Sequence, residues 1–181
     1  MKLALVPIAL AALLVAGCGG SSSSSSSPSP QDWADSLCSS ITTWSNSVKT
    51  AGESLKSGSL SKGDLKNTTS EIKSATNTFA DDLKGLGKPD TEGGDKAKST
   101  LDTLSDQLTQ DVDSIKKAAD DASAGSGGIV KAISSVSATL TTAGNQVQTA
   151  FSSLQQLDTK GELEKAFENS ASCKKLTSSS G

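Results

Sequence analysis

Five aspartates recur in one stretch of the chain at spacings that place them on one side of a helix. They are Asp95, Asp102, Asp106, Asp113 and Asp120. At about 100° per residue these positions fall within roughly 40° of one another, nearly opposite a stripe of leucines. Carboxylates in single file on one helix rarely enclose a metal ion. The row is therefore a candidate surface for a cation or a basic partner, and its alternative is an ordinary solvated helix face.

The residue types that carry most enzyme chemistry are missing from this chain. It has no histidine, and its 17 basic residues are all lysine. Without histidine, the many serine and threonine hydroxyls lack a base that titrates near neutral pH. Without arginine there is no bidentate clamp for phosphate. The net charge of −3 comes without a basic cluster that would attract nucleic acid. We therefore expect no catalytic activity, no cofactor, no metal site and no nucleic-acid partner.

The amino end combines a positive charge, an apolar run and a cysteine. Lys2 precedes the apolar run Leu3–Val15, which is too short to span a bilayer, since that takes about 20 apolar residues. The tetrapeptide Val15-Ala16-Gly17-Cys18 then places small residues directly before a cysteine. This arrangement resembles the lipobox of bacterial lipoproteins. The resemblance implies that residues 1–17 are a signal peptide and that the sulfur of Cys18 is joined to diacylglycerol.

The same resemblance implies a cellular location. Two acyl chains on one residue anchor a protein stably, where a single chain binds only marginally. We expect a membrane partner through the lipid on Cys18, on the extracytoplasmic face of a bacterial cell membrane. The alternatives are a secreted protein cut without lipidation and a helix with a chance buried cysteine.

A serine tract separates this anchor from the rest of the chain. Ser21–Ser27 and the Pro-Ser-Pro that follows offer no apolar side chain to bury, so residues 18–30 are predicted to be the lipidated cysteine and a disordered tether. Its reach by flexible-chain scaling is about 20 Å.

Two cysteines remain if Cys18 carries lipid. In an oxidising compartment Cys38 and Cys173 would most simply form a disulfide. Two free thiols are the alternative. A cysteine pair so far apart, without histidine, is not a metal-binding motif.

The rest of the chain shows helical periodicity, with apolar residues recurring at intervals of three and four. The stripes run from Trp33 to Leu55, from Leu65 to Leu86, from Ala97 to Ala122, from Ile129 to Leu157 and, in a short fifth helix, from Leu163 to Cys173. Three pairs resemble capping boxes at helix starts: Ser29 with Asp32, Ser61 with Asp64, and Thr159 with Glu162.

Four long amphipathic helices joined by short loops favour antiparallel neighbours. We predict an all-α protein: an up-down four-helix bundle over residues 31–176, with a short fifth helix that brings Cys173 to Cys38. Residues 177–181 are predicted to be a disordered tail. A three-helix bundle with one broken helix, or an elongated pair of hairpins, would also fit the pattern.

The sequence names no substrate. Our leading hypothesis is a non-catalytic, membrane-anchored helical module that binds an envelope protein or polymer. A second hypothesis is a receptor for a small apolar ligand held between the helices, where the small residues Thr69, Thr76 and Ala143 leave room. An enzyme that uses carboxylates alone is the third.

Overall fold

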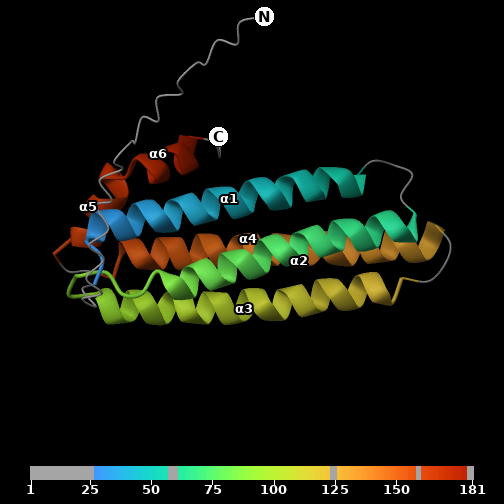
Figure 1. Cartoon of the computed structure of the whole chain (residues 1–181), viewed down its shortest axis with the longest axis horizontal. Coiled ribbons are helices and arrows are strands. Elements are labelled where there is room, and N and C mark those ends of the chain that lie inside the picture. The colour runs from blue at the N-terminus through green and yellow to red at the C-terminus, as the bar shows by residue number, and fades with distance from the viewer. Residues whose placement is uncertain (1–26, 57–60, 123–125, 158–159, 179–181) are drawn as a thin grey trace, which may run out of the picture.

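The computed structural model describes residues 27–56, 61–122, 126–157 and 160–178, and this part of the chain is all-helical (Figure 1). Its helices are α1 (Pro30–Lys56), α2 (Lys62–Gly85), α3 (Gly94–Asp120), α4 (Ser126–Gln155), α5 (Glu162–Asn169) and α6 (Ala171–Ser178). The four long helices pack against one another as the apolar periodicity predicts, and the two short ones follow at the carboxyl end. The predicted all-α bundle is confirmed. The predicted signal peptide and residues 18–26 of the predicted tether lie outside the described residues. The last residues of that predicted tether are ordered instead, since Ser29 caps α1 and Pro30 begins it.

Local hydrogen bonds explain where the first two helices begin. The hydroxyl of Ser29 accepts from the backbone N–H of Asp32 at 3.2 Å and donates to the Asp32 carboxylate at 2.7 Å. Ser61 and Asp64 form a complete capping box at the start of α2. These bonds confirm both capping predictions. Each cap satisfies N–H groups that a helix start leaves without intrahelical partners.

The predicted stripes form the core. Trp33 and Trp44 are 1% and 6% exposed, which assigns both indoles to packing rather than to a surface site. The Trp44 ring stacks on Phe79 with centroids 5.1 Å apart, and its N–H donates to the hydroxyl of Thr76 at 3.1 Å. A second cluster fills the far end of the bundle. It contains Ala51, Leu55, Leu65, Ile72, Ile115, Ala119, Ala122, Ala132 and Val136.

The carboxyl-terminal segment differs from the single helix that its periodicity predicts. Ser170 adopts extended backbone angles (φ −62°, ψ 126°) and divides the segment into α5 and α6. The prediction of one fifth helix is therefore wrong. The capping prediction at its start is also wrong, because the N-cap of α5 is Gly161 in the left-handed region (φ 67°). Thr159 itself lies outside the described residues.

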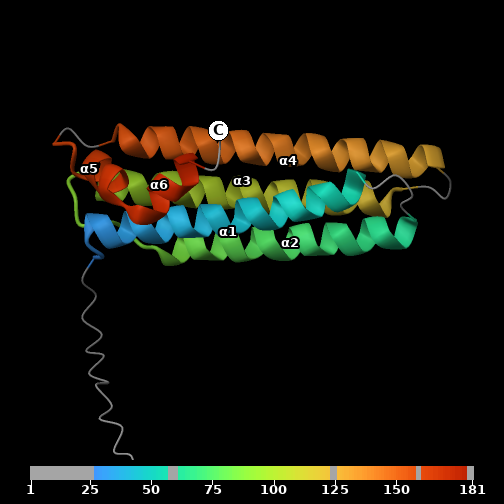
Figure 2. The ribbon, with the colours of Figure 1, turned by 90° about the horizontal axis from the view of Figure 1, so that it is seen from above.

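The two short helices form an arm that folds back over α1 (Figure 2). α5 also contacts α4, so the arm joins the first and last long helices. The bundle extends from Pro30 to at least Ser178, so α6 includes the first two residues of the predicted tail. The other tail residues, 179–181, lie outside the described part of the chain.

Candidate functional site

The aspartate row lies along α3, but lysines stand beside its members. Asp95 pairs with Lys88 at 3.0 Å, and Asp106 pairs with Lys84 at 3.2 Å. The remaining pairs are Asp102 with Lys98 and Asp120 with both Lys66 and Lys116. Asp120 and, more weakly, Asp113 raise the pKa of Lys116. Because these contacts are largely exposed, each contributes little to stability. The row is a surface of mixed charge and not a concentrated negative patch.

Within the described residues, no group of three or more histidine, cysteine, aspartate or glutamate side chains is arranged to hold a metal ion. In the same part of the chain, none of the helices combines the length and the apolar character that crossing a bilayer requires.

A disulfide joins the carboxyl-terminal arm to α1. Cys38 and Cys173 are bonded, with their Cα atoms 5.0 Å apart and a sequence separation of 135. Both cysteines are buried, at 0% and 3% exposure. The predicted pairing is confirmed, and the burial is that of a structural disulfide and not of a reactive one.

A second contact holds the arm one helical turn away from the disulfide. The hydroxyl of the fully buried Ser170 donates to the carboxylate of Asp35 at 2.5 Å and accepts from the backbone N–H of Cys173 at 3.0 Å. The Asp35 carboxylate also accepts from the N–H of Ser172 at 3.3 Å. Asp35 therefore sits at the positive end of α6, where its negative charge is favoured.

Asp35 and Cys38 of α1 thus face Cys173 of α6 and Ser170, which caps the start of α6, and we call these four residues the arm clamp. Asp35 and Cys38 are three residues apart and therefore lie on one face of α1. The cysteines were found from the sequence. Asp35 was missed, because its partner Ser170 is 135 residues away and no local pattern links the two.

The arm clamp makes a pH-dependent contribution to stability. The Ser170 hydroxyl, and after it the N–H of Ser172 and the side chain of Gln31, hold the pKa of Asp35 below its ordinary value. A depressed carboxylate pKa stabilises the fold at pH above the unfolded pKa of about 4 and stops doing so as pH falls through the folded pKa.

Asp35→Asn is therefore expected to lower the free energy of unfolding at pH 7 by about 1–2 kcal/mol, the worth of hydrogen bonds to a partly exposed charge. Urea denaturation of the oxidised protein at a series of pH values measures this. The difference from wild type should shrink progressively as the pH falls below about 4. Asp81→Asn on the exposed face of α2 is the control. A difference that persists unchanged at pH 2 would show that the Asp35 charge is irrelevant.

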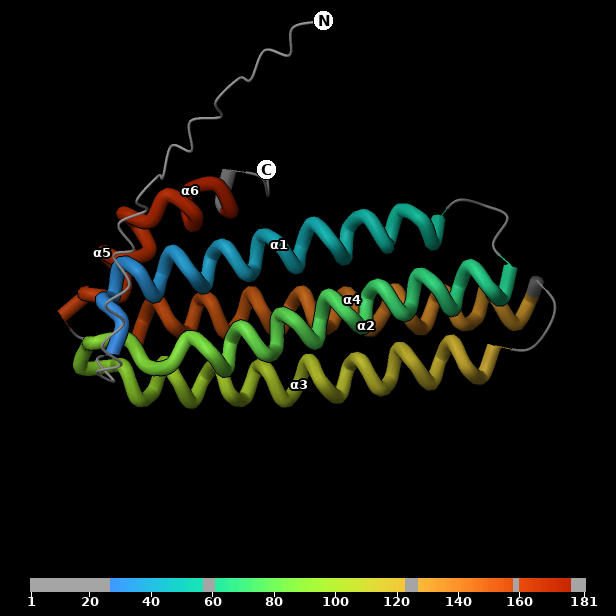
Figure 3. Tube along the Cα trace, viewed as in Figure 1, coloured from blue at the N-terminus to red at the C-terminus, as the bar shows by residue number. Residues whose placement is uncertain are grey.

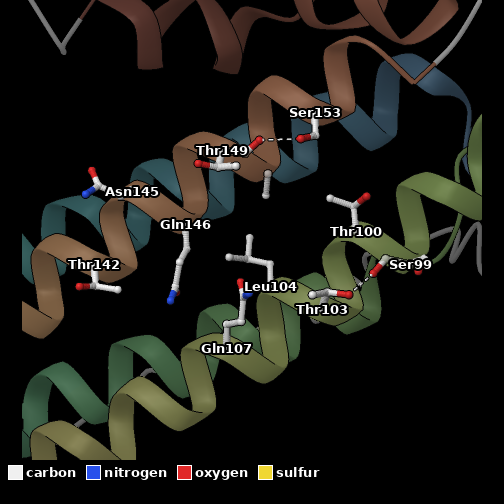
Figure 4. Close-up of a pocket in the computed structure, with 11 residues that line it drawn as sticks. Ser99, Thr100, Thr103, Leu104, Gln107, Thr142, Asn145, Gln146, Thr149 and Ser153 are labelled. Atoms are coloured by element: carbon white, nitrogen blue, oxygen red, sulfur yellow. Dashed lines mark hydrogen bonds between the residues drawn. The ribbon is translucent and has the colours of Figure 1, made fainter.

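An open groove between α3 and α4 is our candidate binding site (Figure 4). Its volume is about 490 Å³, within the range of small-molecule sites. Its lining residues are Ser99, Thr100, Thr103, Leu104, Gln107, Thr142, Asn145, Gln146, Thr149, Ala150 and Ser153. Gln107 of α3 and Gln146 of α4 both extend into the space between the two helices (Figure 4). We call this site the α3–α4 groove.

One wall of the α3–α4 groove contains an amide oxygen that the fold leaves without a partner. Gln146 lies beside the carboxyl group of Asp111, and burial raises the pKa of that carboxyl more than the neighbouring Gln146 amide lowers it. The Oε1 atom of Gln146 is buried and has no hydrogen-bond partner among the described residues. A buried polar atom without a partner costs free energy, so this position can gain from a donor.

The positions where room for an apolar ligand was predicted are filled. Thr76 accepts the hydrogen bond of the Trp44 indole and is 3% exposed. Thr69 and Ala143 are 5% and 2% exposed and belong to the packed interior. The α3–α4 groove was missed because it forms between the outward faces of two helices. The signal was present in the composition of α4, whose single charged residue in 30 is Lys131.

Comparison with protein-family models, with curated proteins and with solved structures finds no match for this chain.

Proposed function

We propose that the protein is a non-catalytic, lipid-anchored binding module on the extracytoplasmic face of a bacterial cell membrane. The anchor is the lipid on Cys18, and the serine-rich segment is the tether. The observation that carries the proposal is the buried Cys38–Cys173 disulfide, since such bonds persist in oxidising, extracytoplasmic compartments. The disulfide and the Val15-Ala16-Gly17-Cys18 motif lie in different parts of the chain, and both support an extracytoplasmic location.

The position of the first described residues also supports this proposal. The carbonyl of Pro28 accepts from the N–H of Asp90 at 3.0 Å, and the Trp33 indole donates to the carbonyl of Gly87 at 3.2 Å. These bonds fix the start of α1 to the loop between α2 and α3, at the end of the bundle where the arm also lies (Figure 3). A tether from Cys18 therefore leads directly into the most heavily cross-linked end of the fold.

Binding is the activity that this architecture supports best. A tether confines a rigid body near the membrane and raises its effective concentration there, so a weak site becomes useful. The α3–α4 groove is our candidate for that site, with an envelope protein or polymer as the partner. The alternative, a receptor for a small apolar ligand, loses support because the proposed positions are packed.

Cell fractionation with a Cys18→Ala variant tests the anchor. Wild-type protein should sediment with membranes and leave them only in detergent, because two acyl chains bind a bilayer stably. The variant should appear almost wholly in the fraction released without detergent, with its Cys38–Cys173 disulfide intact as the check on folding. Equal membrane retention of the two proteins would refute the proposal.

A further inference from the structure

The walls of the α3–α4 groove differ in charge from the rest of the described surface. None of its lining residues is ionisable, whereas the groove between α1 and α2 includes Glu71 and, further along, Asp82. An anionic ligand would find no lysine among the lining residues of the α3–α4 groove. A cationic ligand would be drawn instead to the carboxylates elsewhere on the molecule. The groove is thus suited to a neutral ligand.

Six hydroxyls line the α3–α4 groove, and four of them donate to backbone carbonyls of their own helices at 2.9–3.2 Å. They belong to Thr100, Thr103, Thr142 and Ser153. A hydroxyl has one proton and two acceptor lone pairs, so these groups face a ligand as acceptors. The exposed side-chain amides of Gln107 and Asn145 supply further acceptor oxygens to the groove.

Leu104 and Ala150 are the two wholly apolar side chains among the lining residues of the α3–α4 groove, and they are 3% and 8% exposed. A partner helix that docks through apolar side chains would find too little surface here to bury. A molecule with many O–H donors and small C–H patches fits the acceptors and these two residues together.

We propose that the α3–α4 groove binds an uncharged, polyhydroxylated chain, that is, a neutral oligosaccharide or polysaccharide. This deepens the proposed function, because it names the class of polymer that the anchored module holds. Recognition rests on hydrogen bonds from ligand hydroxyls to threonine and glutamine oxygens. The lining includes no aromatic ring for a sugar to stack on, so the affinity of one site is weak, and confinement by the anchor compensates for it.

The test uses the full chain in a detergent whose headgroup is not a sugar, with neutral hexasaccharides of glucose and of mannose as probes. Amide chemical shifts in NMR spectra follow the titration. We expect dissociation constants of about 1–10 mM for at least one probe, with the largest shifts at the lining residues of α3 and α4. A hexasaccharide of galacturonic acid, which carries carboxylates, should bind at least about fivefold more weakly.

Two isosteric variants make this test specific. Thr103→Val with Thr142→Val removes acceptors from both walls of the groove and should weaken binding at least about fivefold, since each net hydrogen bond is worth about 1 kcal/mol. Thr141→Val is the matched control, because Thr141 is exposed on α4, makes the same kind of bond to its own helix and lies outside the groove. Its affinity should stay within about twofold of wild type.

Three results would overturn the glycan assignment. One is the absence of shifts with either neutral probe at about 20 mM. Another is equal binding by the double valine variant and the Thr141→Val control. The third is tighter binding of the acidic probe. None of these results bears on membrane retention. The glycan proposal and the lipid-anchor proposal can therefore be refuted independently of each other.

Discussion

Replacing Cys38 and Cys173 together by alanine is expected to lower the free energy of unfolding by about 4–5 kcal/mol. The reason is the length of the closed loop, which spans 135 residues and restricts the unfolded chain accordingly. Domains of this kind are stable by only about 5–15 kcal/mol, so the variant should be on the edge of folding at 37 °C. Urea denaturation followed by circular dichroism measures the loss.

The matched control is Cys18→Ala, which removes a cysteine without opening the disulfide and should leave the unfolding free energy unchanged. Reduction of the wild-type protein with a strong thiol should reproduce the alanine variant, although slowly, because both sulfurs are buried. A loss below about 1 kcal/mol would mean that hydrogen bonds such as Ser170 to Asp35 hold the arm without the covalent bond.

The second large effect is expected from Phe79→Ala, which should cost about 3–5 kcal/mol. Phe79 is 1% exposed, and its ring stacks on that of Trp44 in the core that surrounds the disulfide. Truncation removes the buried ring and leaves a cavity that helices held at both ends cannot easily close. Thermal and urea denaturation of the oxidised variant measure the change.

Phe151→Ala provides the comparison for the same chemical change. Phe151 on α4 is only partly buried and meets Phe167 edge to face with centroids 4.9 Å apart, so its truncation should cost less than half as much. Equal losses for the two variants would contradict the assignment of Phe79 to the rigid centre of the fold.

The long helices could be predicted because one local property, the spacing of apolar residues, determines both their extent and their buried face. Leu101, Leu108 and Ile115 illustrate this, since each was placed on the buried stripe of α3 and each is at most 2% exposed. The disulfide followed from elimination and topology. The start of α2 at Ser61 could also be predicted, because a capping box is a pattern that is local in the sequence.

Local sequence patterns could not predict the carboxyl-terminal arm or the α3–α4 groove. The break at Ser170 depends on a contact with Asp35, which is 135 residues away, and no helical periodicity encodes that contact. The α3–α4 groove depends on how the outer faces of two helices meet. The lysines beside the aspartate row came partly from another helix, as Lys84 of α2 beside Asp106 shows. These features arise from packing, which the sequence expresses only through distant residues.

The central claim is that this chain is a disulfide-closed bundle held to a membrane by lipid on Cys18. Intact mass spectrometry of the protein extracted from membranes without reductant tests both parts at once. We predict a mature chain that begins at Cys18, carries diacylglycerol and has no thiol open to alkylation. An unmodified terminus at any other residue, or two alkylated cysteines at positions 38 and 173, would contradict this account.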